Sequence, residues 1–223
     1  MRTPPSVQMH TLRAAWRAAN GLPNGDPSPC WWMTNAATPK LYVHGMIGGL
    51  DLDATEFVQA VHAIDAKVID LYVNSPGGFV WDAMSMYEAL LTHPAQVTTH
   101  VTGVAGSAAS FLALAGDTVE TARGSRWMIH DAQTVAIGNP AELREAADLA
   151  DAVSNDIAGI YAERAGGKPA DWRKAMTATT WYSAEQAVGA GLADRVTGGK
   201  TDGPDNRTRI IQARFRALAT QGG

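Results

Sequence analysis

The stretch Val68-Ile69-Asp70-Leu71-Tyr72-Val73-Asn74-Ser75-Pro76-Gly77-Gly78 decides the fold of this chain. Its first six residues are mostly β-branched or large apolar types, which predicts a strand that ends near Val73. The following five residues are types that favour a turn. Apolar residues then recur every three or four positions, as on one face of a helix, at Val80, Met84, Tyr87 and Leu91. A strand, a turn and a helix in this order predict an α/β fold with a mainly parallel sheet.

The same alternation continues on both sides of this stretch. Further strands are predicted over 41–47, 97–104 and 127–130, and further helices follow Asp53 and span 107–115 and 139–166. The last helix has Asn139 as its cap, a proline in its first turn, and Gly166-Gly167 as its stop. Its apolar stripe is longer than a domain of this size usually buries, which indicates a subunit contact, and the alternative is a helix that faces the core of its own domain. The stripe consists of Leu143, Ala146, Ala150, Val153, Ile157 and Ile160.

Three segments are expected along the chain. Residues 1–40 hold six of the eleven prolines and are expected to form a flexible arm with little regular structure. Residues 41–196 are expected to form the folded domain. Residues 197–223 begin with glycines and charged residues and continue as a basic stretch with apolar helical spacing, which predicts a linker and a short tail helix.

Composition excludes several classes of protein. With 46% hydrophobic and 18% charged residues, the chain of 223 residues can fill a core and is not wholly disordered. A net charge of -4 lacks the basic excess that nucleic acid attracts, so no nucleic-acid partner is expected. One cysteine, Cys30, cannot form an intrachain disulfide. Neither a signal peptide nor a membrane span is indicated, so we expect a cytoplasmic protein without a membrane partner.

Three positions carry residues suited to acyl transfer, which needs a hydroxyl or thiol, a base and donors for the developing oxyanion. Ser110 lies in the first turn of the predicted helix 107–115, where unpaired N–H groups favour an anion. His130 ends a predicted strand, where α/β folds commonly face a ligand. Gly77-Gly78 lets the backbone approach a substrate. Each also has a structural interpretation: a tightly packed serine, a structural histidine and an ordinary turn.

Five ordered motifs resemble those of the Clp serine peptidase family (peptidase S14), and most closely its phage-type branch of head-maturation (prohead) proteases. They are Leu71–Gly78, Gly103–Ser110, Met128–Asp131, Thr180–Ala187 and Gly191–Asp194, within a region of resemblance from Leu41 to Val196. The resemblance implies a ClpP/crotonase-like fold of repeated strand-strand-helix units, with a mainly parallel sheet and a long protruding helix.

The resemblance also implies roles for individual residues. Ser110 is expected to be the nucleophile and His130 its general base, with the backbone N–H groups of Gly78 and Phe111 as the oxyanion hole. The family carries an acidic third member at the position of Thr179, where this chain departs from the pattern. A threonine hydroxyl can accept the imidazole N–H, but it brings no charge to stabilise an imidazolium. Asp131 would be a poor substitute unless the strand has ended before it, because neighbouring strand residues point to opposite faces.

The function that the resemblance implies is a serine endopeptidase, ATP-independent or unfoldase-assisted, that cuts capsid or scaffold protein during phage head maturation. It would act as a ring-forming homo-oligomer in the host cytoplasm or the prohead, and no cofactor or metal is required. One alternative is a catalytically weak or inactive assembly protein, since Thr179 replaces the acid. Another is a crotonase-type acyl-CoA enzyme, although no glutamate pair is evident near these loops.

Overall fold

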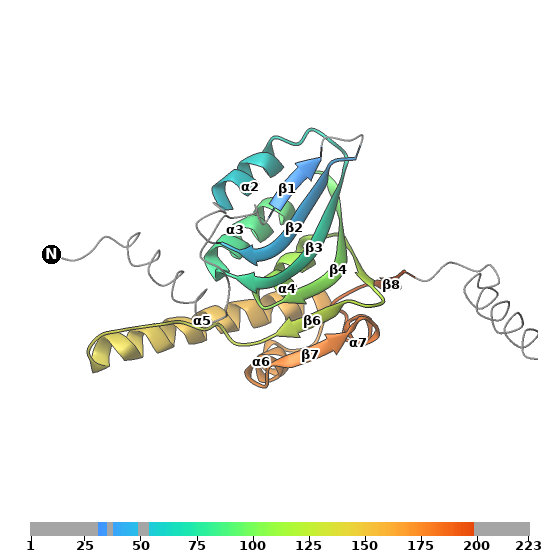
Figure 1. Ribbon diagram of the computed structural model, residues 1–223. Coiled ribbons are helices and arrows are strands. Elements are labelled where there is room, and N and C mark those ends of the chain that lie inside the picture. The colour runs from blue at the N-terminus through green and yellow to red at the C-terminus, as the bar shows by residue number, and fades with distance from the viewer. Residues whose placement is uncertain (1–30, 35–37, 49–53, 199–223) are drawn as a thin grey trace, which may run out of the picture.

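The computed structural model describes residues 31–34, 38–48 and 54–198, which form a mixed eight-stranded sheet with helices packed against it (Figure 1). The strands are β1 (Trp31–Thr34), β2 (Lys40–Ile47), β3 (Val68–Gly78), β4 (Gln96–Gly106), β5 (Thr118–Ala122), β6 (Arg126–Ile129), β7 (Thr180–Ser183) and β8 (Arg195–Thr197). The helices are α2 (Ala54–His62), α3 (Val80–Leu91), α4 (Ala108–Leu112), the short 3-10 helix η1 (Ala113–Ala115), α5 (Pro140–Ala165), α6 (Pro169–Thr177) and α7 (Ala184–Gly189). The predicted α/β class, with a mostly parallel sheet and one long helix, is confirmed.

The sheet divides at β4. Its main path runs β1-β2-β3-β4-β5-β8, and all neighbours along it are parallel except β1 and β2. The first half of β4, Thr98 to Val101, pairs with β5, whereas Val104 to Gly106 pair with β6. β6 in turn carries the antiparallel β7. The end of β4 therefore leads into a second branch, on which the candidate site lies.

Alternating residues of the central strands build the core. Leu71 and Val73 of β3 and Val97, Thr99 and Val101 of β4 are buried, whereas Tyr72, Thr98 and His100 between them are partly exposed. α2 and α3 lie on one side of β1 to β4 (Figure 1). Burial of an apolar side chain of this size stabilises the fold by roughly 1.5–3 kcal/mol. The alternation seen in the sequence thus fixes which face of the sheet the helices cover.

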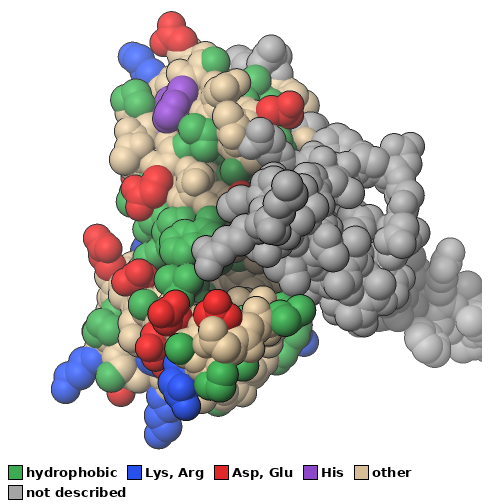
Figure 2. Space-filling model, turned by 90° about the vertical axis from the view of Figure 1, so that its left-hand side faces the viewer, with side chains coloured by type: hydrophobic (Ala, Val, Ile, Leu, Met, Phe, Trp, Pro, Cys, Tyr) green, Lys and Arg blue, Asp and Glu red, His purple; other side chains and the backbone are tan. Residues whose placement is uncertain are grey.

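The long helix α5 begins and ends as predicted. Asn139 Oδ1 accepts the Glu142 N–H at 3.2 Å, and Glu142 Oε2 accepts the Asn139 N–H at 2.9 Å, which together form a capping box. However, the buried side chains of α5 all lie between Val153 and Tyr161, and Leu143 is 44% exposed. The first half of α5 projects from the domain (Figure 1), and acidic and basic side chains gather on the projecting side of the molecule (Figure 2).

Some predicted segments differ from the structure or lie outside it. Trp31–Thr34, within the expected arm, form β1. Residues 1–30, which include Cys30, and residues 199–223, where the tail helix is expected, lie outside the described residues. The sequence analysis missed β5, β7, β8, α6 and α7. Among the helices that the structure describes, none is long and apolar enough to cross a membrane.

Candidate active site

The last five residues of β3, which the sequence predicts as a turn, continue the strand to Gly78 and are held by their own polar side chains. The register between β3 and β4 shifts after Val73, and Asn74 Oδ1 there accepts the Val104 N–H at 3.1 Å. The buried Ser75 Oγ accepts the Gly77 N–H at 3.1 Å. Gly77 has a φ of 97°, which only glycine adopts without strain. These contacts bring the end of β3 close to the N-terminal end of α4.

Ser107 occupies the junction between β4 and α4 in a strained backbone conformation. Its φ of 51° and ψ of -126° lie outside the regions that L-residues normally occupy. Its N–H donates to the Met128 carbonyl oxygen at 2.8 Å, which ties it to β6. A Cβ on Gly77 would lie 2.7 Å from Ser107 Cβ and 2.8 Å from the Ala108 nitrogen. Strain that the surrounding structure enforces in this way is common at functional sites.

His130 follows the last residue of β6, and its ring meets Ser107. The distance from His130 Nε2 to Ser107 Oγ is 2.7 Å. Burial lowers the pKa of His130, although the charge and the backbone of the adjacent Asp131 partly oppose the shift. A neutral imidazole at a serine hydroxyl is the pairing in which histidine acts as a general base.

Ser110 does not meet His130 as the sequence analysis expected. Its side chain is fully buried, and its hydroxyl donates to the Ser107 carbonyl oxygen at 2.5 Å and lies 2.7 Å from the Tyr161 hydroxyl. Ser110 is the third residue of α4, and its hydroxyl meets Tyr161 of α5, whereas Ser107 is the N-cap residue that follows β4 and is hydrogen-bonded to β6. The expected contact is therefore corrected: the serine that pairs with His130 is Ser107.

With Ser107 as the serine beside His130, the backbone N–H groups near the site are not both those expected from the sequence. Phe111 is the fourth residue of α4 and is buried, so its N–H lies within the helix rather than at its open end. Ala108 is the first residue of α4 and directly follows Ser107. Gly78 ends β3 beside Gly77, which lies against Ser107 and Ala108. Gly78 thus stays near the candidate site, and Ala108 takes the place expected for Phe111.

Thr179 brings no charge to the end of the β6–β7 ladder. β6 and β7 are antiparallel, and their last pair is Ile129 with Thr180, so His130 directly follows the ladder on one strand and Thr179 directly precedes it on the other. Thr179 is exposed and has a φ of 50°, an uncommon value for a β-branched residue. Among the residues that the structure describes, no hydrogen bond joins the Thr179 side chain to the His130 ring, so the role of Thr179 as a third member stays a prediction.

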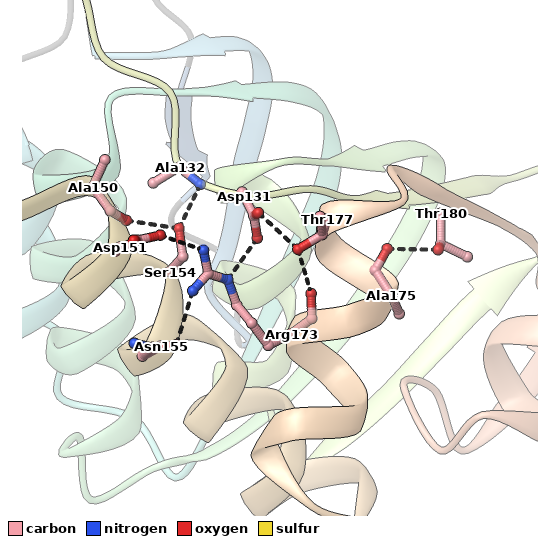
Figure 3. Close-up of polar contacts among 10 residues, drawn as sticks. All are labelled: Asp131, Ala132, Ala150, Asp151, Ser154, Asn155, Arg173, Ala175, Thr177 and Thr180. Atoms are coloured by element: carbon pink, nitrogen blue, oxygen red, sulfur yellow. Dashed lines mark hydrogen bonds and ion pairs between the residues drawn. The ribbon is translucent and has the colours of Figure 1, made fainter. Parts of the chain in front are cut away.

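An acidic group does lie next to His130 in the chain. β6 ends at Ile129, and the carboxylate of Asp131 accepts hydrogen bonds from Arg173 Nε at 2.8 Å and Thr177 Oγ1 at 2.9 Å (Figure 3). Burial disfavours the charged carboxylate, but these hydrogen bonds and the charges of Arg173 and His130 outweigh it and lower the pKa of Asp131. The sequence analysis missed Ser107 as the partner of His130, and it missed Arg173 and Tyr161 entirely.

The fold and the site together define a class of protein. A serine in strained backbone at a strand end, hydrogen-bonded to a histidine on a neighbouring strand, is the arrangement of serine hydrolases. In the part of the chain that the structure describes, no group of three or more His, Cys, Asp or Glu could hold a metal ion.

Comparison with known proteins identifies the family. The Clp protease family model matches residues 53–200, well over half of the chain. An ATP-dependent Clp protease proteolytic subunit of Pleurastrum terricola is 30% identical over 138 residues, which cover 61% of this chain and 70% of that protein. Proteolytic subunit 3 of Streptomyces coelicolor is 32% identical over 130 residues, 57% of this chain and 60% of that protein. The chain belongs to the Clp protease family, whose members are serine peptidases.

Proposed function

We propose that this chain is a serine endopeptidase in which Ser107 is the nucleophile and His130 the general base. The hydrogen bond between His130 Nε2 and Ser107 Oγ, at 2.7 Å, is the observation that carries the proposal. The lowered pKa of His130 supports it, because a neutral ring is available to accept the serine proton at neutral pH. Family membership favours peptide hydrolysis over the acyl-CoA alternative.

The mechanism follows from these positions. Ser107 Oγ attacks the peptide carbonyl carbon while His130 Nε2 takes the hydroxyl proton, and a tetrahedral oxyanion forms. Its collapse breaks the peptide bond, and His130 returns the proton to the leaving amine. Water, deprotonated by His130, then hydrolyses the acyl-enzyme and releases Ser107.

We propose the backbone N–H groups of Ala108 and Gly78 as the oxyanion hole. The N–H of Ala108 is the first of α4, where helix N–H groups have no intrahelical acceptor. The Phe79 N–H donates to the Ile47 carbonyl oxygen at 2.8 Å, toward β2, so the preceding N–H of Gly78 is directed to the opposite side. Loss of one such donor costs about 3 kcal/mol of transition-state stabilisation in comparable enzymes.

A serine-reactive fluorophosphonate probe tests the nucleophile on the full chain. We expect the native protein to be labelled, Ser107→Ala to lose labelling, and Ser110→Ala to keep it. Ser110→Ala is a matched control because it also removes a serine hydroxyl, from a position only three residues away. Labelling that persists in Ser107→Ala, or that depends on Ser110 alone, would refute the assignment.

The substrate and the assembly are part of the same proposal. The resemblance to head-maturation proteases supports capsid or scaffold protein as the substrate, cut in the host cytoplasm or the prohead. The relatives are named as ATP-dependent, and this chain spans 60% to 70% of their length. The exposed first half of α5 supports a ring-forming homo-oligomer, because its apolar positions lack a partner within the described chain. Co-expression with capsid and scaffold proteins should give shortened products that Ser107→Ala abolishes.

A second candidate function is a non-catalytic assembly protein of the same fold. Thr179 favours it, since the position at which the family carries an acid has no charge here to stabilise an imidazolium. This candidate predicts that no serine-reactive probe labels the assembled native protein. Its oligomeric state would be identical in the native chain and in Ser107→Ala.

A further inference from the structure

One guanidinium joins the end of β6 to two helices. Arg173 of α6 donates from Nε to Asp131 at 2.8 Å, from Nη2 to Asp151 at 2.7 Å and from Nη1 to Asn155 at 2.9 Å (Figure 3). Asp151 and Asn155 lie one turn apart on α5. The planar guanidinium can satisfy three acceptors in fixed directions, which lysine cannot. Arg173 therefore fixes where the chain runs directly after His130.

The same segment has a second attachment to α5. The N–H of Ala132 donates to Ser154 Oγ at 2.9 Å, and that hydroxyl donates to the Ala150 carbonyl oxygen at 2.7 Å (Figure 3). Ser154 is buried. Asp131 and Ala132 are thus both bound to the helices behind them, so the backbone that carries the His130 ring has little freedom to shift away from Ser107.

We propose that Arg173 is a positioning residue for His130, and that Asp131, which Arg173 holds, supplies through space the negative charge that Thr179 lacks. The inference rests on the proposed peptidase function and deepens it. Both carboxylate oxygens of Asp131 are held by α6, one by Arg173 and the other by Thr177. A carboxylate fixed in this way stabilises an imidazolium in the transition state without touching the ring.

The charges near His130 set the size of the effect. Asp131 favours the protonated ring, and Arg173, which is ion-paired with Asp131 and with Asp151 of α5, partly neutralises that carboxylate. A nearby opposite charge commonly shifts a pKa by one or more units, and one unit is a tenfold change in the protonation equilibrium. Because Arg173 offsets Asp131 and both side chains are partly exposed, we expect loss of the Asp131 charge to slow the reaction of Ser107 by about threefold to tenfold. This is far less than the roughly ten-thousandfold loss of rate on removal of a directly bonded triad acid.

The test uses the full chain and two measurements. The first is the NMR titration of the His130 ring, assigned with His130→Gln, and the second is the rate of fluorophosphonate labelling as a function of pH. The variants are Asp131→Asn, Arg173→Gln and the double variant. Arg164→Gln is the matched control, because Arg164 also joins α5 to an aspartate, Asp194, at 2.7 Å.

We expect Asp131→Asn to lower the pKa of His130 and to slow labelling by about threefold to tenfold. Arg173→Gln should slow labelling similarly without lowering that pKa, because Asp131 keeps its charge. The double variant should be no slower than the slower single variant, since both act through one network. Arg164→Gln should match the native chain. If Arg173→Gln does not fold, Thr177→Val removes one hydrogen bond to Asp131 and should also slow labelling.

An unchanged His130 titration and an unchanged labelling rate in Asp131→Asn would overturn the inference. Losses that multiply in the double variant, or equal slowing by Arg164→Gln, would also overturn it. Failure of the proposed function gives a different result: the native chain itself would not be labelled, whereas the His130 titration would still report the charge of Asp131.

Discussion

The hydroxyl groups of Ser110 and Tyr161 lie 2.7 Å apart in the core, where they join α4 to α5 directly behind Ser107. Burial raises the pKa of Tyr161, so its hydroxyl stays protonated at ordinary pH. The Ser110 hydroxyl also reaches the Ser107 carbonyl oxygen. This pair therefore has a structural role: it supports the strained residue that meets His130.

Removing this hydrogen bond should cost stability more than activity. Tyr161→Phe leaves the buried Ser110 hydroxyl with one partner fewer, which typically costs about 1–2 kcal/mol. Denaturant unfolding should show that loss, while fluorophosphonate labelling of Ser107 should persist. Complete loss of labelling in a folded Tyr161→Phe protein would contradict a purely supporting role.

An acid at position 179 should strengthen the site. Thr179→Asp places a carboxylate directly before β7, at the end of the ladder that His130 follows on β6, where it should raise the pKa of His130 and stabilise its imidazolium. It also replaces a β-branched residue at a φ of 50°, a conformation that Asp tolerates better. Labelling should accelerate by about tenfold or more, a fraction of what a native triad acid contributes.

Thr179→Asn separates the two effects of that substitution. Asn relieves the same backbone strain without a charge, so it should raise stability and leave the labelling rate near the native value. Equal acceleration by Asn and Asp would show that strain, rather than charge, limits the native site.

The pH dependence of labelling follows from the direction of the His130 shift. The rate should rise as pH increases through a pKa below 6.5 and then level off, because only the neutral ring accepts the Ser107 proton. The free energy of unfolding should change in the same direction. Below pH 6.5 the His130 ring is protonated in the unfolded chain but stays neutral in the folded protein until its lower pKa is reached, so the folded state loses stability as the pH falls. A midpoint above 6.5 would contradict the dominance of burial at this ring.

Gly77 should tolerate no side chain. A Cβ there would lie 2.5 Å from the Gly106 carbonyl oxygen and close to Ser107 and Ala108, at a φ of 97°. Gly77→Ala should therefore lower the free energy of unfolding by about 1–3 kcal/mol and abolish most labelling. Gly124→Ala is the control, because nothing lies within 4 Å of a Cβ at Gly124. Equal effects of the two substitutions would contradict the close approach of Gly77 to Ser107.

Much of the fold could be predicted from local patterns. The apolar spacing of α3 and the cap at Asn139 gave the correct elements, and the apolar run from Val68 to Val73 gave the first part of β3. The turn predicted after Val73 was wrong, because Asn74 to Gly78 continue the strand to pair with β2. The missed strands have only three to five residues, which is too short for a clear period. α6 was missed because only Trp172 and Met176 mark its buried face.

The site was predicted in place but not in detail. His130 was recognisable because it ends an apolar strand. Ser107 and Ser110 could not be told apart locally, because both stand among small residues in the same short motif. What separates them is the strained backbone of Ser107 and the burial of Ser110 against Tyr161, and tertiary packing sets both. Arg173 escaped notice because its contact with Asp131 spans 42 residues.

The division of β4 separates two tasks along a single strand. Thr98 to Val101 pair with β5, in the part of the sheet that carries the hydrophobic core, and Val104 to Gly106 pair with β6, which leads to His130. Substitutions in the first segment should register as changes in thermal tolerance, and those in the second as changes in turnover. The residues near the site can therefore vary along the β6 side of β4 while the β5 side keeps the molecule folded.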